Sequence, residues 1–381
     1  MNSSIDSSSD QMIQQAAQRL LDGGLVAFPT ETVYGLGADA ENVEAIARIY
    51  AAKGRPANHP VIVHLAPGAE LGYWAAQVPP QAHLLIDAFW PGPLTLILPR
   101  AGRIPADVAG GQDSIGLRCP SHPVAQALLR RFAELKGGHG GVAAPSANQF
   151  GQVSPTLAEH VRAEFPAMAE DELLILEGGA SEVGIESTIL DLSRLERGVG
   201  PIILRPGHIT AAQIGEVLGL APEDLIPAEA GVDEHGADQA GRHEGVRTRE
   251  RDAVQGQSQG QAHSQAPRVS GSLKAHYAPR TPLQVLPRQE MLSLLDSAKS
   301  QESRVACVMF EPLRDTSAYG PGVDCFAAPA QPDAYARELY ALLRRLDQGG
   351  YTRLIFEQPP RSAPWRAVND RLGRAAAAFD I

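Results

Sequence analysis

The tract from Pro222 to Pro267 is the feature of this 381-residue chain that most limits how it can fold. It consists of Gly, Gln, Ala, His and charged residues, with almost no large apolar side chains. Such a segment cannot bury enough apolar surface to offset the entropy of ordering it, so it predicts a linker. The chain therefore divides into two compact units, and its length exceeds that of one typical domain.

The expected boundaries follow from where patterned sequence begins and ends. Residues 1–10 are rich in Ser and Asp and have neither a basic nor an apolar region, which is unlike a signal peptide and predicts a disordered N-terminus. We expect a first folded unit over 11–215, a linker over 216–280 and a second unit over 281–381. The linker regains specific character near its end, so 268–280 is a candidate lid over a site in the first unit.

Predicted strands and helices alternate in the first unit without a strict βαβ rhythm. Short apolar runs predict strands at 25–28, 61–65, 94–98, 114–119, 173–176, 187–192 and 201–204. Helical periodicity and capping residues predict helices at 10–22, 42–53, 79–89 and 122–136, and a short helix after Thr210. We therefore expect an α/β fold with a twisted, mixed open sheet.

The second unit alternates more regularly. Its pattern predicts strands at 283–286, 305–310 and 354–356, and helices at 290–298, at 333–346 and from Pro364. Regular alternation of this kind predicts a small parallel α/β, Rossmann-like domain. The unit carries no Gly-rich phosphate loop.

Composition narrows the class of function. The formal net charge of −11 argues against a protein that holds nucleic acid through a broad basic surface. The three cysteines, Cys119, Cys307 and Cys325, have no metal-ligand spacing, so neither structural zinc nor a disulfide framework is expected. No apolar run reaches the 18 or so residues that span a bilayer, and we expect a cytoplasmic protein without a membrane partner.

The ten residues Phe28–Gly37 read Phe-Pro-Thr-Glu-Thr-Val-Tyr-Gly-Leu-Gly and combine a strand end with polar side chains. Thr30, Glu31 and Thr32 follow the predicted strand, at the carboxyl end where open α/β sheets bind ligands. This position favours a ligand site, and the structural alternative is a capped turn before a helix.

Residues Gly35–Ala40 formally match the dinucleotide-binding fingerprint, with Ala at its third glycine position. The match is weak, because the fingerprint needs an acidic residue about 20 positions later, where this chain has the basic, proline-broken segment Lys53–Pro60. A basic loop indicates an anionic phosphate ligand rather than a ribose hydroxyl.

Four basic side chains of the first unit fall in loops or at strand ends, namely Lys53, Arg55, Arg118 and Arg205. Each alone is typical of a surface charge. Together they can converge on a triphosphate, since guanidinium groups match phosphate oxygens and Lys supplies a point charge.

Other polar residues have competing interpretations. Ser146, Ser154 and Ser187 add hydroxyls at loop or strand ends, where helix capping is the structural alternative. His64 lies in an apolar strand, which favours a satisfied core histidine, with a polar pocket as the alternative. Cys119 has no identifiable base, which favours a small buried side chain over a reactive thiolate.

Several motifs in order resemble a known family. They are PTETVYGLG, KGRP, HPVIVHL, FWPGPLTLIL, GLRCP, APSAN, SPT, GIEST and LRPG. Together they resemble the YrdC-like domain. With HYAP after the linker and a second α/β unit, the chain is similar to the two-domain form of the threonylcarbamoyl-adenylate synthases over about residues 11–210 and 268–381.

This resemblance implies an enzyme that joins L-threonine, bicarbonate and ATP into threonylcarbamoyl-AMP and releases pyrophosphate, with Mg²⁺ accompanying ATP. Other proteins then transfer the group to the adenosine next to the anticodon of certain tRNAs. The carbamate formed from threonine and bicarbonate is itself the nucleophile, so the reaction needs no nucleophilic Ser, Cys or Lys. The protein must position and neutralise the reactants.

The resemblance also implies roles for individual residues. We expect the catalytic residues to be Lys53 and Arg55, and no residue is expected to hold a metal. We expect the L-threonine pocket to contain Thr32, His64, Arg118, Ala144 and Ser187. We expect the ATP site to contain Arg55, His59, Ser114, Ser146, Ser154, Arg205 and Tyr277. His59 stands where the family often has Asn, and 270–273 reads Ser-Gly-Ser-Leu in place of Ser-Pro-Gly-Met.

Two alternatives stay open. An RNA-binding or ribosome-maturation module could use a concave surface of the same fold, but the chain is acidic and lacks the interleaved basic and aromatic residues of single-strand platforms. The other alternative keeps carbamoyl-adenylate chemistry and changes the acceptor.

Overall fold

The computed structural model describes residues 7–227, 266–297, 304–313, 319 and 322–380. In these ranges the helices are α1 (Ser7–Leu21), α2 (Val43–Lys53), α3 (Leu71–Trp74), α4 (Pro80–Phe89), α5 (Pro123–Leu135), α6 (Ala158–Glu164), α7 (Ala211–Leu218), α8 (Arg288–Ser297), α9 (Pro332–Asp347) and α10 (Arg366–Ala376). The predicted disorder of residues 1–6 and most of the predicted linker lie outside the described residues.

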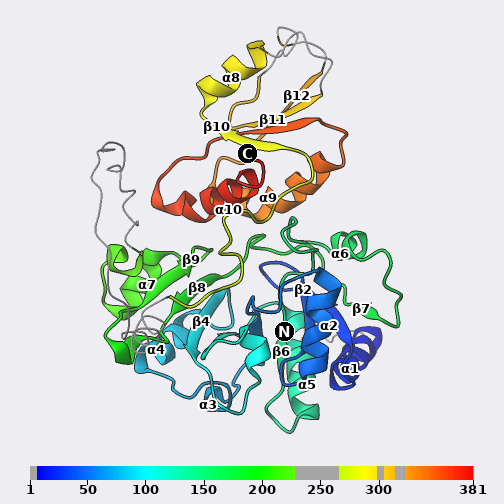
Figure 1. Cartoon of the computed structure of the whole chain (residues 1–381), viewed down its shortest axis with the longest axis vertical. Coiled ribbons are helices and arrows are strands. Elements are labelled where there is room, and N and C mark those ends of the chain that lie inside the picture. The colour runs from blue at the N-terminus through cyan, green and yellow to red at the C-terminus, as the bar shows by residue number, and fades with distance from the viewer. Residues whose placement is uncertain (1–6, 228–265, 298–303, 314–318, 320–321, 381) are drawn as a thin grey trace, which may run out of the picture.

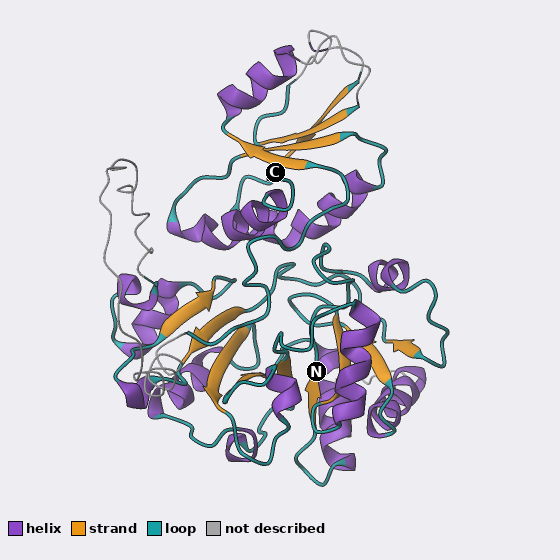
Figure 2. Cartoon of the chain, viewed as in Figure 1, coloured by secondary structure: helices purple, strands orange, loops and turns teal. Residues whose placement is uncertain are grey.

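The strands form two sheets. They are β1 (Leu25–Phe28), β2 (Gly35–Asp39), β3 (Ile62–Leu65), β4 (Leu94–Pro99), β5 (Ser114–Arg118), β6 (Gly141–Ala143), β7 (Leu173–Ile175), β8 (Thr188–Asp191), β9 (Ile202–Arg205), β10 (Leu283–Leu286), β11 (Val305–Met309), β12 (Val323–Ala327) and β13 (Arg353–Glu357). The first nine belong to one unit and the last four to the other, and Figures 1 and 2 show the two units one above the other.

The first unit holds a sheet in the order β7-β1-β2-β6-β3-β5-β4-β8-β9. Parallel pairs such as β3 with β5 stand beside antiparallel pairs such as β4 with β5. The prediction of a twisted, mixed open sheet is therefore confirmed. Strand β1 is entirely apolar and buried along its length, which is typical of a sheet packed between helices.

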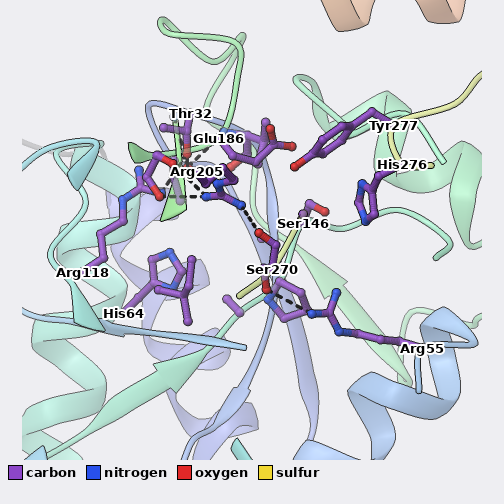
Figure 3. A pocket seen from close by; sticks show the side chains of 18 residues that line it. Thr32, Arg55, His64, Arg118, Ser146, Glu186, Arg205, Ser270, His276 and Tyr277 are labelled. Atoms are coloured by element: carbon purple, nitrogen blue, oxygen red, sulfur yellow. Dashed lines mark hydrogen bonds between the residues drawn. The ribbon is translucent and has the colours of Figure 1, made fainter. Parts of the chain in front are cut away.

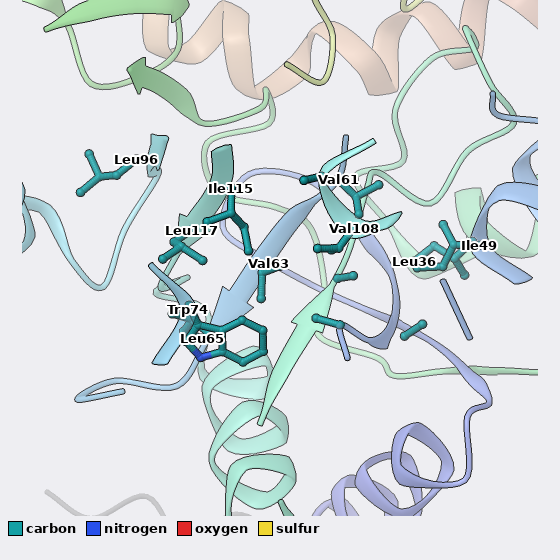
Figure 4. Close-up of a cluster of buried hydrophobic side chains, with 14 of the residues drawn as sticks. Leu36, Ile49, Val61, Val63, Leu65, Trp74, Leu96, Val108, Ile115 and Leu117 are labelled. Carbon is teal, nitrogen blue, oxygen red and sulfur yellow. The ribbon is translucent and has the colours of Figure 1, made fainter. Parts of the chain in front are cut away.

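Apolar side chains of the central strands form the core that holds this sheet. Val63 and Leu65 of β3 and Ile115 and Leu117 of β5 pack with the buried indole of Trp74 (Figure 4). Each fully buried Val, Leu or Ile stabilises the fold by roughly 1.5–3 kcal/mol. The loops at the strand ends therefore rest on a rigid base.

The segment Gly35–Asp39 differs from its prediction. It forms strand β2, which pairs antiparallel with β1 and β6 and is buried along its length. The alternative interpretation of this segment as a turn before a helix is therefore wrong. The dinucleotide-binding fingerprint is also excluded, because Gly35 and Gly37 lie within a strand. A Cβ on Gly37 would lie 2.8 Å from both the Phe28 ring and Val142, so glycine permits this close packing.

Both ends of the first unit extend beyond their expected boundaries. Helix α1 begins at Ser7, within the predicted disordered segment, and its Ala16, Ala17 and Leu20 are fully buried in a cluster with residues of α5. After α7 the unit continues past residue 215 to Leu225, which is fully buried. None of the described helices combines the length and apolarity that crossing a membrane requires.

The second unit contains an all-parallel sheet in the order β10-β13-β11-β12, which confirms the predicted parallel α/β domain. Helix α8 lies on one side of this sheet, and α9 and α10 lie on the side that faces the first unit (Figure 1). Strand β12 was not predicted. It lies at the edge of the sheet, is half-exposed, and its sequence Val-Asp-Cys-Phe-Ala contains the charged Asp324, so it lacks an apolar run. Its Cys325 pairs in register with Cys307 of β11, and both thiols are free.

Candidate active site

A small cavity of about 40 Å³ lies in the first unit, where the ends of several strands meet the segment 266–280 (Figure 3). Its walls come from the loop after β1, the ends of β5 and β9, the loop after β6 and the residues before β8. It is lined by Thr30, Thr32, Val33, Gly35, Arg55, Ile62, His64, Arg118, Ala144, Pro145, Ser146, Glu186, Ser187, Arg205, Ser270, Gly271, His276 and Tyr277.

The cavity brings together most of the residues expected from the sequence. All of those expected around L-threonine line it: Thr32, His64, Arg118, Ala144 and Ser187. Of those expected around ATP, it is lined by Arg55, Ser146, Arg205 and Tyr277. Residues far apart in the chain therefore meet at one place.

Arg118 ends β5 and is held on all sides of its guanidinium group. Nη2 donates to Glu31 at 2.6 Å, Nη1 to the hydroxyl of Thr32 at 2.9 Å and Nε to the carbonyl of Gly92 at 3.3 Å. The side chains of Arg118 and Glu31 are each only 4% exposed. These bonds use three of the five N–H groups of Arg118, and the other two can donate to a small carboxylate in the cavity.

Arg205 ends β9 and ties the residues before β8 to the segment 266–280. It donates to the carbonyl of Ser187 at 3.1 and 2.9 Å, to the hydroxyl of Ser187 at 3.1 Å and to the carbonyl of Ser270 at 2.9 Å. The hydroxyl of Ser187 also shares a hydrogen bond with Thr95 at 2.8 Å. Burial lowers the pKa of Arg205 from its usual value.

Arg55 lies at the opposite side of the cavity and contacts the same serine. Its Nη2 donates to the hydroxyl of Ser270 at 3.0 Å and to the carbonyl of Pro60 at 2.8 Å. Burial is the main cause that lowers the pKa of Arg55 to about 10, and it remains a cation at neutral pH. Arg55 and Arg205 thus approach one short segment from two sides (Figure 3).

The segment 266–280, which contains the candidate lid, covers the cavity. Tyr277 is 1% exposed and has a φ of 63°, which is rare for a bulky residue and indicates backbone strain. A Cβ on Gly271 would lie 2.0 Å from the Tyr277 hydroxyl, so the segment can fold on itself only with glycine at that position. A cavity of about 40 Å³ is far smaller than the roughly 300–1,000 Å³ of ordinary ligand pockets, so a ligand the size of a nucleotide does not fit while this segment stays in place.

Several buried polar atoms around the cavity lack a hydrogen-bond partner. Within the described residues they are Arg55 Nε, His64 Nδ1, His276 Nδ1 and the Tyr277 hydroxyl. Burial, and then the charge of Arg118, lower the pKa of His64 to about 3, so its ring is neutral at neutral pH. The sequence pattern favoured a satisfied core histidine, and this is wrong because His64 lines the cavity with one nitrogen unpaired.

Four of the expected site residues lie outside the lining. Lys53 is buried behind the loop after β6, where its ammonium group donates to the carbonyls of Ser146 and Asn148, and burial holds its pKa well below the usual value. His59 is half-buried with its ring edge against Phe150. Ser114 lines a neighbouring hollow beside Ser270. In this structure Lys53 therefore supports a loop rather than facing the cavity.

Ser154 does not cap a helix, as the pattern had suggested. Its hydroxyl donates to Glu186 Oε1 at 2.6 Å. Glu186 itself was missed as a site residue, although it lies in the GIEST motif directly before Ser187, and it lines the cavity. Cys119 is buried, and burial raises its pKa to about 11, which agrees with a structural thiol.

Comparison with known proteins covers both units. A family model described as Telomere recombination matches residues 18–207, and one described as Threonylcarbamoyl-AMP synthase, C-terminal domain, matches residues 209–377. The chain is 33% identical over 370 residues to a threonylcarbamoyl-AMP synthase of Pyrococcus abyssi, covering 96% of this chain and 94% of the relative. It is 34% identical over 373 residues to a protein of the same name in Bacillus subtilis, covering 97% and 94%.

A solved structure is also similar over both units. The crystal structure of Pyrococcus abyssi Sua5 complexed with L-threonine aligns with a TM-score of 0.73 and 31% sequence identity. The alignment covers 96% of this chain and 94% of that one. The similarity therefore extends through the segment 266–280 and the second unit.

Proposed function

Because this chain belongs to the threonylcarbamoyl-AMP synthase family, we propose that it makes L-threonylcarbamoyladenylate from L-threonine, bicarbonate and ATP, with release of pyrophosphate. It is then a nucleotidyltransferase of the cytoplasm. Its product supplies separate transfer proteins, which modify the adenosine next to the anticodon of tRNA. Stable binding of tRNA by this chain is not part of the proposal.

The observation that carries this proposal is the donor set around one cavity. Arg55, Arg118 and Arg205 place three guanidinium groups along its wall, and unpaired polar atoms of His64 and Tyr277 face the same space. Charged and neutral donors held in a dry site stabilise phosphate and carboxylate oxygens more strongly than they do in water. Such a set suits a reaction in which two anionic substrates meet.

The proposed reaction proceeds in two steps. The threonine amine attacks the bicarbonate carbon, water leaves, and a carbamate forms. A carbamate oxygen then attacks the α-phosphorus of ATP, and pyrophosphate leaves. In this scheme Arg118 and Thr32 hold the amino acid, while Arg55 and Arg205 exchange their Ser270 contacts for phosphate oxygens. The protein contributes position and charge and forms no covalent intermediate.

Mg²⁺ enters the proposal with ATP. Glu186 is the carboxylate that lines the cavity, but its oxygens already accept hydrogen bonds from Ser154, Tyr340 and Arg371. The phosphates are therefore the expected ligands, with hydroxyls such as those of Ser146 and Ser270 nearby, which suits an ion that keeps several waters. Bound there, it would neutralise charge on the phosphates.

A substrate survey tests the proposed function directly. Incubation with ATP, bicarbonate and each amino acid in turn is expected to release pyrophosphate fastest with L-threonine and only when bicarbonate is present. Discrimination against serine rests on one methyl group, worth roughly 1–3 kcal/mol, so slow turnover of serine is expected. Equal rates with serine and glycine, or tight retention of tRNA in a gel shift without any turnover, would favour the alternatives.

The segment 266–280 gives a second prediction. If it must withdraw for substrates and close again over the product, ATP with L-threonine will change its cleavage by protease, and protection is expected once the ternary complex closes. The Tyr277→Ala variant should then lose the labile intermediate to water faster than the unaltered protein does. Mass spectrometry of the fragments locates the cuts. Unchanged cleavage near Tyr277, together with unaltered product loss in the variant, would contradict a lid.

A further inference from the structure

The second unit reaches the cavity through two helices. Tyr340 of α9 donates to Glu186 Oε2 at 2.8 Å, and Nε of Arg371 in α10 donates to the same oxygen at 2.8 Å. The other oxygen accepts from Ser154 at 2.6 Å. Arg371 is fully buried, and Tyr340 is too. A carboxylate of the first unit is therefore held mainly by side chains of the second.

Glu186 is joined directly to the residues that face the substrates. It precedes Ser187, whose carbonyl and hydroxyl accept hydrogen bonds from Arg205. Arg205 in turn donates to the carbonyl of Ser270 in the segment 266–280. A displacement of Glu186 therefore moves one residue proposed to contact L-threonine and one proposed to contact ATP.

Helix α10 also contacts the segment that covers the cavity. The Arg371 guanidinium lies 5.2 Å from the ring centre of Tyr277, within range of a cation–π interaction. One turn later, Arg374 donates to the carbonyl of Leu273, and its own carbonyl accepts from the backbone of His276 at 3.1 Å. The same helix thus binds both the carboxylate and the covering segment.

We propose that Arg371 is a positioning residue for the reaction in the neighbouring unit, holding Glu186 and Tyr277 in one arrangement and thereby setting Ser187 and Arg205 in the cavity. This inference rests on the proposed function of the cavity and gives the second unit a part in the reaction. Arg371 acts through Glu186 and touches no substrate.

Electrostatics give this arrangement a measurable signature. Burial alone would raise the pKa of Glu186, but Arg371 and then Arg205 lower it from about 4.5 to about 2. The groups that face Glu186 are Arg371 from α10, Tyr340 from α9, Arg205 from β9, Ser154 from the loop before α6, and His276 and Tyr277 from the segment 266–280. Asp370 of α10 contacts Arg371 at 2.5 Å. Without Arg371, burial still disfavours the charged form of Glu186, so its pKa rises.

The first experiment compares the pH dependence of kcat/KM in the full chain. We expect Arg371→Met to lower kcat/KM by on the order of 10- to 100-fold, because a small misplacement of site residues has effects of this size. Relative to the unaltered protein, its profile should also fall further as the pH drops and Glu186 takes up a proton. Arg337→Met is the matched control, since Arg337 spans the same interface and donates to the carbonyl of Glu182 at 2.7 Å. It should not acquire the pH step.

Two further variants separate positioning from loss of folding. Arg371→Lys retains a cation and should recover part of kcat/KM and remove most of the pH step. Arg371→Met combined with Glu186→Gln has no carboxylate to titrate, so its profile should again run parallel to that of the unaltered protein. A pH step that persists in the double variant, or unaltered kinetics in Arg371→Met, would overturn the proposal.

A measurement without substrates distinguishes this proposal from the proposed function. The stability that Glu186 gains from its lowered pKa is present above about pH 4.5 and is lost as the pH falls toward 2. The gap in urea midpoint between Arg371→Met and the unaltered protein should therefore be widest at neutral pH and narrow below about pH 4.5. A pH-independent gap would count against the Arg371–Glu186 link, whereas absence of turnover in the unaltered protein would count against the synthase function.

Discussion

Replacing Arg118 with alanine is expected to lower the free energy of unfolding by about 3–5 kcal/mol, because Glu31 would remain buried without its cation. The same change should weaken L-threonine binding by on the order of 10- to 100-fold, the effect of losing a charge-assisted hydrogen bond. The basis is the 2.6 Å contact between the two side chains, each 4% exposed. Urea denaturation and calorimetric titration with L-threonine measure the two effects separately.

A double variant separates stability from binding. Glu31→Gln added to Arg118→Ala removes the stranded charge, so most of the lost stability should return while L-threonine still binds weakly. Arg55→Ala and Arg205→Ala are the matched comparison, since they should raise the KM for ATP more than the KM for L-threonine. If the double variant regains L-threonine affinity, or if all three arginine variants give the same kinetic profile, the assignment of Arg118 to the amino acid is wrong.

The second large effect is expected at Gly184, where the two units touch backbone to backbone. Its φ is 78°, and a Cβ there would lie 2.4 Å from the Cα and 2.5 Å from the carbonyl oxygen of Arg337. Gly184→Ala should therefore combine about 1–2 kcal/mol of backbone strain with about 1–3 kcal/mol of overpacking. The free energy of unfolding should fall by their sum, and kcat/KM should fall because Glu186 lies two residues away.

Gly179 provides the control for this variant. It has nearly the same φ of 76°, and nothing lies within 4 Å of a Cβ placed on it. Gly179→Ala should show the strain alone, about 1–2 kcal/mol, with little change in turnover. Equal losses of stability in the two variants would show that the methyl group at residue 184 causes no overpacking against Arg337.

Much of the fold followed from local patterns in the sequence. The apolar run 25–28 and the mainly apolar run 94–98 become strands because both faces of the sheet are covered. The short helix predicted after Thr210 also forms as α7, and the Thr210 hydroxyl caps it by accepting from the backbone N–H of Gln213. Strand β2 was missed because its glycines suggest a turn, whereas tertiary packing between β1 and β6 decides the outcome.

The candidate site was harder to predict from local patterns. The basic residues suggested a common phosphate site, but their assignment to L-threonine or to ATP came from the resemblance of several motifs in order. Glu186 was missed because its partner Arg371 lies 185 residues away in the sequence, and no local rule connects them. Lys53 is the converse case, since a basic residue before a loop suggested phosphate, whereas in this structure its ammonium group donates to buried carbonyls.

The contacts of Ser270 make the segment 266–280 a competitor carried on the same molecule. Its hydroxyl accepts from Arg55 and its carbonyl accepts from Arg205, the two cations that the proposed function assigns to the phosphates of ATP. Because the segment belongs to the same chain, its competition with ATP does not weaken when the protein is diluted. The apparent dissociation constant for ATP is then the intrinsic one divided by the fraction of molecules in which Ser270 has withdrawn. Selection on this enzyme could therefore adjust its response to the cellular ATP level through Ser270 and its neighbours, while every residue that touches the nucleotide stays the same.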